Sequence, residues 1–291
     1  MPAALIDRAP AKINLTLRVL GRRRDGYHTI ASLVAFVRLH DRLAFTPGGP
    51  LDLELGGPTA AAIGHPRHNL VLKAARALSE EIKGLTLGRF TLEKFLPVAA
   101  GLGGGSSDAA AALRLLARAN HLRRSDRRIA KVARSLGADV PVCLDPRPRY
   151  IHGIGEVLSR PLRIPKIPVV LVHPGVPLAT KDVFARHDRL RRPAGRRSRP
   201  PERPVPRRRN AFLAMLAAEA NDLEPAAIAL VPAIVDVLAA LRNSPGCRLA
   251  RMSGSGATCF GLFSSRRAAT AAARKIAGRH RRWWVRASVL D

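Results

Sequence analysis

The chain has 291 residues, of which 47% are hydrophobic and 24% are charged. This length suits two compact domains or one large one, and the apolar content excludes a wholly disordered chain. We expect no transmembrane helix, because no apolar run approaches about 18 residues. We expect no signal peptide either, because Met1–Leu5 is followed by Asp7 and Arg8 before an apolar region can form. Three scattered cysteines, Cys143, Cys247 and Cys259, match neither a disulfide framework nor a zinc site, so we expect a cytoplasmic protein.

The charge is strongly positive: 50 Lys and Arg against 21 Asp and Glu give +29, a balance typical of nucleic-acid-binding proteins. The densest basic tract is 186–210, with eleven arginines and five prolines against one Asp and one Glu. Like-charge repulsion predicts a disordered loop there. Aromatic residues make up only 4% of the chain, so few rings are available to stack on bases. We therefore do not expect nucleic-acid binding through 186–210; the positive field also suits a small anionic substrate.

The predicted elements of the first half are strands and then helices. Alternating apolar residues predict strands over 13–19, 51–55, 85–87 and 90–92. Helical spacing and composition predict helices over 70–78, 106–120 and 126–136. The expected N-caps are Asn69, Ser106 or Ser107, and Ser125, with Gly137 ending the third helix. After Asp139 we expect an apolar strand.

The second half mixes both element types. Apolar runs predict strands over 167–172, 249–252, 259–263 and 283–289, and helical spacing predicts helices over 211–220, 234–241 and 266–277. Strands and helices in both halves are consistent with a pair of α+β or α/β domains, divided near residue 155.

A glycine-rich segment, PVAAGLGGGSSDAAAAL from Pro97 to Leu113, precedes the second helix. Glycines let backbone N–H groups approach a ligand, and the helix N-terminus adds roughly half a positive charge at the same place. The segment lacks the lysine of a Walker A loop and the glycine spacing of a Rossmann motif. We therefore expect it to bind phosphate in a different way.

Two charged residues are candidates for chemistry. Asp139, within GADVP, could accept a proton or bind a cation, although an Asp in this position is often only a turn residue. Lys12 and Asn14 share one face of a predicted strand, and such a lysine can simply extend its ammonium into solvent.

Two loops are candidates for binding. Tyr27 and His28, within DGYH, carry rings that could stack on a base or only anchor a turn. The loop 253–258, SGSGAT, could hold a phosphate through backbone N–H and hydroxyl groups, or could be a plain hairpin.

Taken in order, these segments resemble the GHMP small-molecule kinases, on PAKINL, RRRDGYHTI, PVAAGLGGGSSDAAAA, GADVPV, IGE and RMSGSGATCFGLF. The resemblance covers about residues 5–185 and 211–265, and the tract 186–210 does not align with it. It implies an α+β fold with two domains. Residues 1–155 would form an N-terminal domain of the ribosomal S5 domain 2-like type, and 156–291 a smaller ferredoxin-like α/β domain.

The activity that the resemblance implies is ATP-dependent phosphoryl transfer to an alcohol. PAKINL together with DGYH resembles family members that phosphorylate the 2-hydroxyl of the methylerythritol moiety of a cytidyl diphosphate sugar alcohol, in the non-mevalonate route to isopentenyl diphosphate. By the same resemblance Asp139 is the general base and Lys12 its electrostatic partner. ATP would act with Mg²⁺, whose protein ligands we do not predict, and without a tightly bound prosthetic group. We expect a monomer or homodimer that does not bind membranes.

The resemblance also implies the binding residues. Those for the ATP phosphates are Pro97, Val98, Ala99, Ala100, Gly101, Leu102, Gly103, Gly104, Gly105, Ser106 and Ser107. Those near adenine are Asn69, Leu70 and Lys94, and those for the cytidyl substrate are Asn14, Tyr27, His28, Thr180 and Phe184. Three alternatives stay open at this point: a related kinase for homoserine or mevalonate, a scaffold that binds without catalysis, and a nucleic-acid-binding protein.

Overall fold

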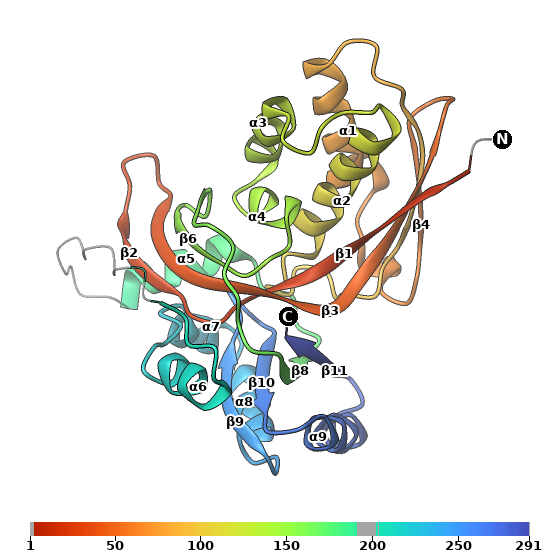
Figure 1. Cartoon of the computed structure of the whole chain (residues 1–291). Coiled ribbons are helices and arrows are strands. Elements are labelled where there is room, and N and C mark those ends of the chain that lie inside the picture. Colours follow the sequence, from red (N-terminus) through yellow and green to blue (C-terminus); the bar gives the residue numbers. More distant parts are fainter. Residues whose placement is uncertain (1–2, 191–201, 203, 291) are drawn as a thin grey trace. The chain divides into compact units, whose positions relative to one another are not determined.

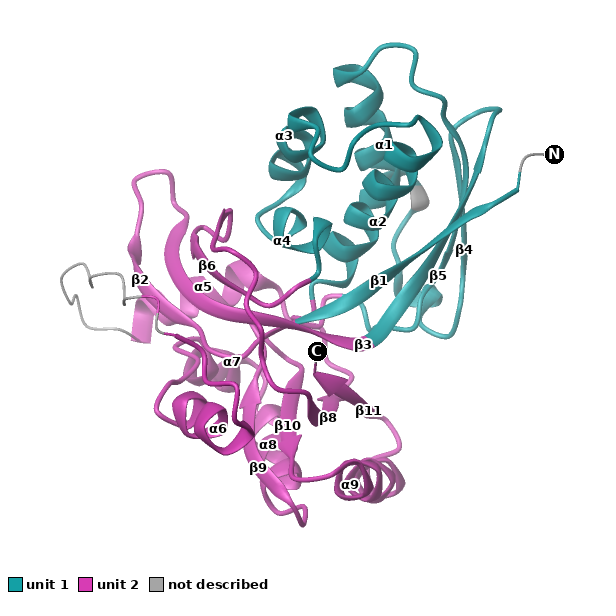
Figure 2. Cartoon of the chain, in the orientation of Figure 1, with its two compact units in different colours: residues 1–12, 39–98, 103–146 teal, residues 13–38, 99–102, 147–291 magenta. Residues whose placement is uncertain are grey.

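The computed structural model describes residues 3–190, 202 and 204–290 (Figure 1). These residues divide into two compact units (Figure 2): unit 1 is residues 1–12, 39–98 and 103–146, and unit 2 is residues 13–38, 99–102 and 147–291. The chain passes between the units several times, so they are not separated by one cut. The predicted boundary between kinase domains near residue 155 stays a prediction.

Unit 1 combines strands with helices on one side of them (Figure 2). Its elements are the start of β1 (Leu5–Asn14), the end of β3 (His28–Pro47), β4 (Asp52–Gly56), β5 (Gly88–Glu93), α1 (Leu70–Glu81), α2 (Gly104–Ala119), α3 (Arg127–Leu136) and α4 (Val140–Leu144), with two short 3₁₀ turns, Ala60–Ala62 and Pro66–His68. Strand β5 pairs in parallel with β4 and antiparallel with β3, opposing Phe90 to Phe45. These two fully buried rings lie 4.5 Å apart and form part of the core.

Unit 2 contains the rest of β1 and β3 together with the C-terminal half of the chain. Its other elements are β2 (Arg18–Arg22), β6 (Arg149–Gly153), β7 (Val157–Leu158), β8 (Ile167–His173), α5 (Thr180–Leu190), α6 (Arg209–Ala217), α7 (Glu224–Leu230), α8 (Ala233–Arg242), β9 (Cys247–Met252), β10 (Cys259–Phe263), α9 (Arg266–Arg279) and β11 (Trp284–Leu290). An antiparallel sheet runs in the order β9-β10-β8-β11, and Leu290 of β11 pairs with Val37 of β3.

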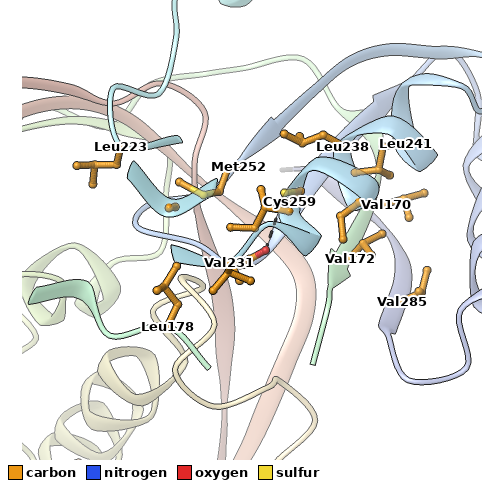
Figure 3. Packing of buried hydrophobic residues seen from close by; sticks show 14 of the residues in the cluster. Val170, Val172, Leu178, Leu223, Val231, Leu238, Leu241, Met252, Cys259 and Val285 are labelled. Atoms are coloured by element: carbon orange, nitrogen blue, oxygen red, sulfur yellow. Dashed lines mark hydrogen bonds between the residues drawn. The ribbon is translucent and has the colours of Figure 1, made fainter. Parts of the chain in front are cut away.

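The core of unit 2 lies where α8 and α9 pack on this sheet. Figure 3 shows Val170 and Val172 of β8 together with Leu238 and Leu241 of α8 in one apolar cluster. Every residue of β8 is buried, which explains why its sequence is a continuous apolar run and not an alternating one.

Most predicted elements are confirmed, including the α+β character and the Asn69 cap, whose Oδ1 accepts a hydrogen bond from Val71 N (2.9 Å). Two other predicted caps are wrong. Helix α2 begins at Gly104 after the left-handed Gly103 (φ 62°), so Ser106 and Ser107 lie inside its first turn. Helix α3 is capped by Asp126, whose Oδ1 accepts from Arg128 N (2.9 Å), and not by Ser125.

Three strand predictions also need correction. The chain leaves the strand at Leu15–Leu17, where Leu17 N donates to Ala220 O instead (3.0 Å), so the predicted strand 13–19 is split between β1 and β2. Residues 85–87 lie before β5. The segment after Asp139 is the short helix α4, since Pro141 suits a first helical turn.

The basic tract 186–210 is helical at both ends, because α5 extends to Leu190 and α6 begins at Arg209. The prediction of a disordered loop therefore fails at these ends. The remainder of that prediction falls mainly on 191–201 and 203, which lie outside the described residues. Among the helices that the structure describes, none is long and apolar enough to cross a membrane.

Candidate active site

Lys12 and Asp139, the predicted catalytic pair, contact each other in unit 1. Lys12 Nζ lies 2.8 Å from Asp139 Oδ2; the lysine side chain is 5% exposed, whereas the carboxylate is 34% exposed. Asp139 lies directly before α4 and makes no capping hydrogen bond there. The geometry therefore presents a carboxylate that solvent can reach, backed by a buried positive charge.

The glycine-rich start of α2 lies next to this pair. A Cβ placed on Gly103 would lie 3.2 Å from Lys12 Cε and 3.7 Å from Asp139 Oδ2. The first hydrogen bond of the helix runs from Ser107 N to Gly103 O (2.8 Å). The N–H groups of Gly104, Gly105 and Ser106 therefore have no acceptor within the helix, which is the arrangement that binds an anion.

The predicted adenine residues Asn69 and Leu70 lie beside the same helix start. A Cβ on Gly105 would lie 3.5 Å from Leu70 Cδ1, so the N-termini of α1 and α2 are in contact. Asn69 is held in place as the cap of α1. These two predicted residues are thus brought close to Gly105, one of the predicted phosphate residues. Pro97, Val98 and 103–107 belong to the same unit.

Lys94, the third predicted adenine residue, is buried and paired within unit 1. Its side chain is 4% exposed, and its ammonium is bound by Asp41 (2.5 Å) and Asp108 (2.7 Å). Its backbone N donates to Gly56 O (2.8 Å) and its carbonyl accepts from Thr59 N (3.2 Å). A contact between this ammonium and adenine does not fit these bonds.

Residues 99–102 of the glycine-rich segment belong to unit 2, where they pack against the second predicted loop, 253–258. Ser253 Oγ donates to Gly101 O (3.1 Å), and Thr258 N donates to Ala100 O (3.3 Å). The same Ser253 Oγ accepts from Asn14 N (3.2 Å). The loop 253–258 is therefore joined to Ala99–Leu102 and is more than a plain hairpin.

The predicted substrate residues Asn14 and Thr180 are bonded to polar partners within unit 2. Asn14 Nδ2 donates to Ser32 Oγ (2.8 Å), while Thr180 Oγ1 and Ser255 Oγ lie 2.9 Å apart. Ser32 on β3 was missed by sequence reasoning, because a serine inside an apolar strand carries no local signal.

A ring pair forms the other predicted substrate group in unit 2. His28 stacks on Phe184 with centroids 4.6 Å apart and planes 19° from parallel. His28 Nε2 lies 2.7 Å from Asp188 Oδ1, which orients the imidazole. Tyr27 is 60% exposed, so its ring is available to a ligand. Asp188 was also missed, since it lies inside the basic tract, where its sequence neighbours suggested a loop.

The thiol nearest the catalytic pair is unsuited to covalent chemistry. Burial, with the Asp139 charge, raises the pKa of Cys143 to about 12, so a thiolate is absent at neutral pH. In the described parts of the chain no three His, Cys, Asp or Glu side chains are grouped so as to hold a metal ion. The arrangement suits proton transfer by a carboxylate beside an anion-binding helix start.

Two family models match the chain: the GHMP kinases N terminal domain over residues 69–145 and the GHMP kinases C terminal domain over 207–281. A protein from Rhodopseudomonas palustris named 4-diphosphocytidyl-2-C-methyl-D-erythritol kinase is 51% identical, covering 99% of this chain and 97% of its own length. A relative of the same name from Methylobacterium radiotolerans is 53% identical, covering 98% and 99%.

Solved structures agree with these matches. The crystal structure of a 4-(cytidine 5'-diphospho)-2C-methyl-D-erythritol kinase superposes with a TM-score of 0.79 at 36% identity, covering 98% of this chain and 99% of that one. A homoserine kinase from Cytophaga hutchinsonii, at 16% identity and a TM-score of 0.69, covers 100% and 95% and shares the fold. The chain therefore belongs to the GHMP kinase family, and within it to the group that contains the 4-diphosphocytidyl-2-C-methyl-D-erythritol kinases.

Proposed function

We propose that this protein is the kinase that transfers the γ-phosphoryl group of ATP to the 2-hydroxyl of 4-diphosphocytidyl-2-C-methyl-D-erythritol, in the non-mevalonate route to isopentenyl diphosphate. Relatives of that name, 51% and 53% identical over nearly their whole length, support this substrate.

The observation that carries the chemistry is the Lys12–Asp139 ion pair (2.8 Å) beside the glycine start of α2. Phosphoryl transfer demands little of a protein beyond positioning the reactants and neutralising the charge that develops on the phosphoryl oxygens. An exposed carboxylate near an anion-binding helix start supplies a proton acceptor and a phosphate site within one unit.

In this proposal, Asp139 accepts the proton of the substrate 2-hydroxyl as its oxygen attacks the γ-phosphorus. The new O–P bond forms while the bond between the γ-phosphorus and the β–γ bridging oxygen breaks, which releases ADP. The Lys12 ammonium stabilises negative charge on Asp139 and on the attacking oxygen. The free N–H groups of Gly104, Gly105 and Ser106 would hold phosphate oxygens.

The cytidyl end of the substrate would bind residues of unit 2. Tyr27 and Phe184 would stack on the cytosine ring, while His28, Asn14 and Thr180 would form the polar side of the pocket. Asp188 would keep the His28 ring in place through its 2.7 Å contact.

ATP would act with Mg²⁺, which neutralises phosphate charge. Mg²⁺ usually keeps water and phosphate oxygens as most of its ligands. We further propose a cytoplasmic protein that works as a monomer or homodimer on small molecules, without nucleic acid or membrane.

A coupled ADP-release assay tests this function. The purified protein with MgATP is given the cytidyl substrate, homoserine or mevalonate in separate reactions. Turnover of the cytidyl substrate alone is expected. Turnover of homoserine or mevalonate would contradict the proposed substrate. If none of the three alcohols is turned over by a protein that binds ATP, the proposed kinase activity is contradicted.

The Asp139→Asn variant tests the proton acceptor. We expect kcat to fall by about a hundredfold or more with ATP affinity nearly unchanged, because the amide cannot take the proton in the transition state. Asp236→Asn, on the exposed face of α8, is the matched control and should keep full activity. An equal loss of ATP affinity in Asp139→Asn would instead indicate a role in holding the nucleotide or its metal.

A further inference from the structure

Three charged side chains form a buried cluster in unit 1, away from solvent. Lys94 directly follows β5, Asp41 lies on β3 and Asp108 lies on α2, with exposures of 4%, 0% and 2%. The ammonium is 2.5 Å from Asp41 Oδ2 and 2.7 Å from Asp108 Oδ2. One lysine therefore joins two strands of the unit to the helix that begins with the glycine-rich segment.

The cluster is held rigidly on its strand side. Asp41 Oδ1 accepts hydrogen bonds from Phe95 N (2.6 Å) and Leu96 N (2.9 Å), so the turn after Lys94 is bonded to the same carboxylate. The backbone of Lys94 is itself paired with Gly56 and Thr59. A Cβ placed on Gly57 would lie 2.5 Å from Lys94 O, so the backbones of Gly57 and Lys94 lie close against each other.

On its other side the cluster lies beside the first residue of α2. A Cβ on Gly104 would lie 3.5 Å from Lys94 Nζ and 3.8 Å from Asp41 Oδ2. Asp108 belongs to the early part of the same helix. The Lys94 ammonium therefore lies next to the helix start and is bonded to the first part of the helix through Asp108.

The charges in the cluster are not balanced, since two carboxylates face one ammonium. Asp108 Oδ1 is buried and has no hydrogen-bond partner among the described residues. Burial, together with the Asp41 charge, raises the pKa of Asp108 to about 7, against the opposing effect of Lys94. Burial would lower the pKa of Lys94, but Asp108 and Asp41 outweigh it and raise that pKa. Without the ammonium, two carboxylates would compete with phosphate for the positive end of α2.

We propose that Lys94 is a positioning residue for the ATP phosphates, which holds the start of α2 in place through Asp41 and Asp108, and that its ammonium does not contact adenine. This inference rests on the proposed function insofar as the start of α2 is taken as the phosphate site. It gives Lys94 a role in ATP binding that needs no direct contact with the nucleotide.

Binding measurements separate the two roles of Lys94. Wild type and Lys94→Met are titrated calorimetrically with ATP and with inorganic tripolyphosphate, which has no base. A positioning role predicts that both ligands lose affinity by a similar factor, on the order of tenfold or more. Loss of ATP affinity with unchanged tripolyphosphate affinity would instead show that Lys94 contacts the adenine base. Unchanged affinity for both ligands would show that Lys94 has no role in ATP binding.

Two further variants keep this test decisive. Lys83→Met, at an exposed lysine of the same unit, is the matched control and should bind both ligands as wild type does. Because Lys94→Met leaves buried carboxylates uncompensated, the neutral variant Asp41→Asn/Lys94→Met/Asp108→Asn is measured as well. It should fold, as judged by its Tm, and still bind both ligands more weakly; wild-type affinity in this folded variant would overturn the proposal.

Steady-state kinetics complete the test. Lys94→Met should raise KM for ATP and leave KM for the cytidyl substrate unchanged, whereas general damage to the fold would affect both. The proposed function fails separately, by a lack of turnover in the wild type that still binds ATP. In that case the calorimetric comparison would still decide the role of Lys94.

Discussion

Gly101→Ala should destabilise the protein strongly, although it adds only one methyl group. Gly101 has φ +72°, a left-handed conformation that costs an alanine about 1–2 kcal/mol. The added Cβ would lie 2.6 Å from Gly256 O and 2.7 Å from Ser253 O, which are backbone atoms that cannot rotate away. Overpacking of this kind typically costs a further 1–3 kcal/mol or so. We therefore expect a total loss of about 2–5 kcal/mol.

Gly105→Ala, four residues along the same segment, is the matched control. Gly105 lies inside helix α2 with ordinary helical geometry, and its added Cβ would only touch Leu70 Cδ1 at 3.5 Å. Replacing a helical glycine by alanine should stabilise the protein by up to about 1 kcal/mol. The two substitutions are chemically identical but are expected to act in opposite directions.

Urea unfolding followed by circular dichroism measures both variants against wild type. The midpoint should fall for Gly101→Ala and stay equal or rise for Gly105→Ala. A Gly101→Ala midpoint within experimental error of wild type would refute the reasoning, because it would mean that the contact between Ala99–Leu102 and the loop 253–258 is not fixed in the folded protein.

The remaining predictions concern pH and substrate binding. Because burial raises the pKa of Asp108 in the folded protein from its ordinary value of 3.8 to about 7, wild type should lose up to about 4 kcal/mol of stability relative to Asp108→Asn as pH rises from 4 to 7. Burial lowers the pKa of His173 from 6.5 to about 4, so wild type should lose up to about 3 kcal/mol relative to His173→Asn as pH falls through that window. Urea midpoints between pH 4 and 7 check both, and parallel curves for wild type and variant would contradict either one. Tyr27→Ala should raise KM for the cytidyl substrate more than KM for ATP in the ADP-release assay, and a selective ATP defect would show that the ring serves the other ligand.

Local sequence predicted most helices and the anion-binding segment. The capping geometry of Asn69 and the helical spacing after it involve neighbouring residues, so α1 could be predicted from its own sequence. The glycine segment was predicted for the same reason, since backbone freedom and the charge of a helix start are properties of a few consecutive residues. Prediction failed where two local signals for a helix start lie close together. Ser106 and Ser107 are typical cap residues, but the left-handed Gly103 precedes them and α2 begins directly after it.

The sequence by itself determined the family and the residue types at the candidate site, because these are encoded in short motifs in a fixed order. Only the tertiary structure decided which of them meet. It placed Lys12 2.8 Å from Asp139, joined the loop 253–258 to Ala99–Leu102, and enclosed Lys94 between Asp41 and Asp108. These contacts join residues far apart in the chain, so no local pattern predicts them. Burial also decides which partners a charged side chain can have: the ammonium of an exposed Lys94 could bind a nucleotide, whereas the buried ammonium must be paired within the protein.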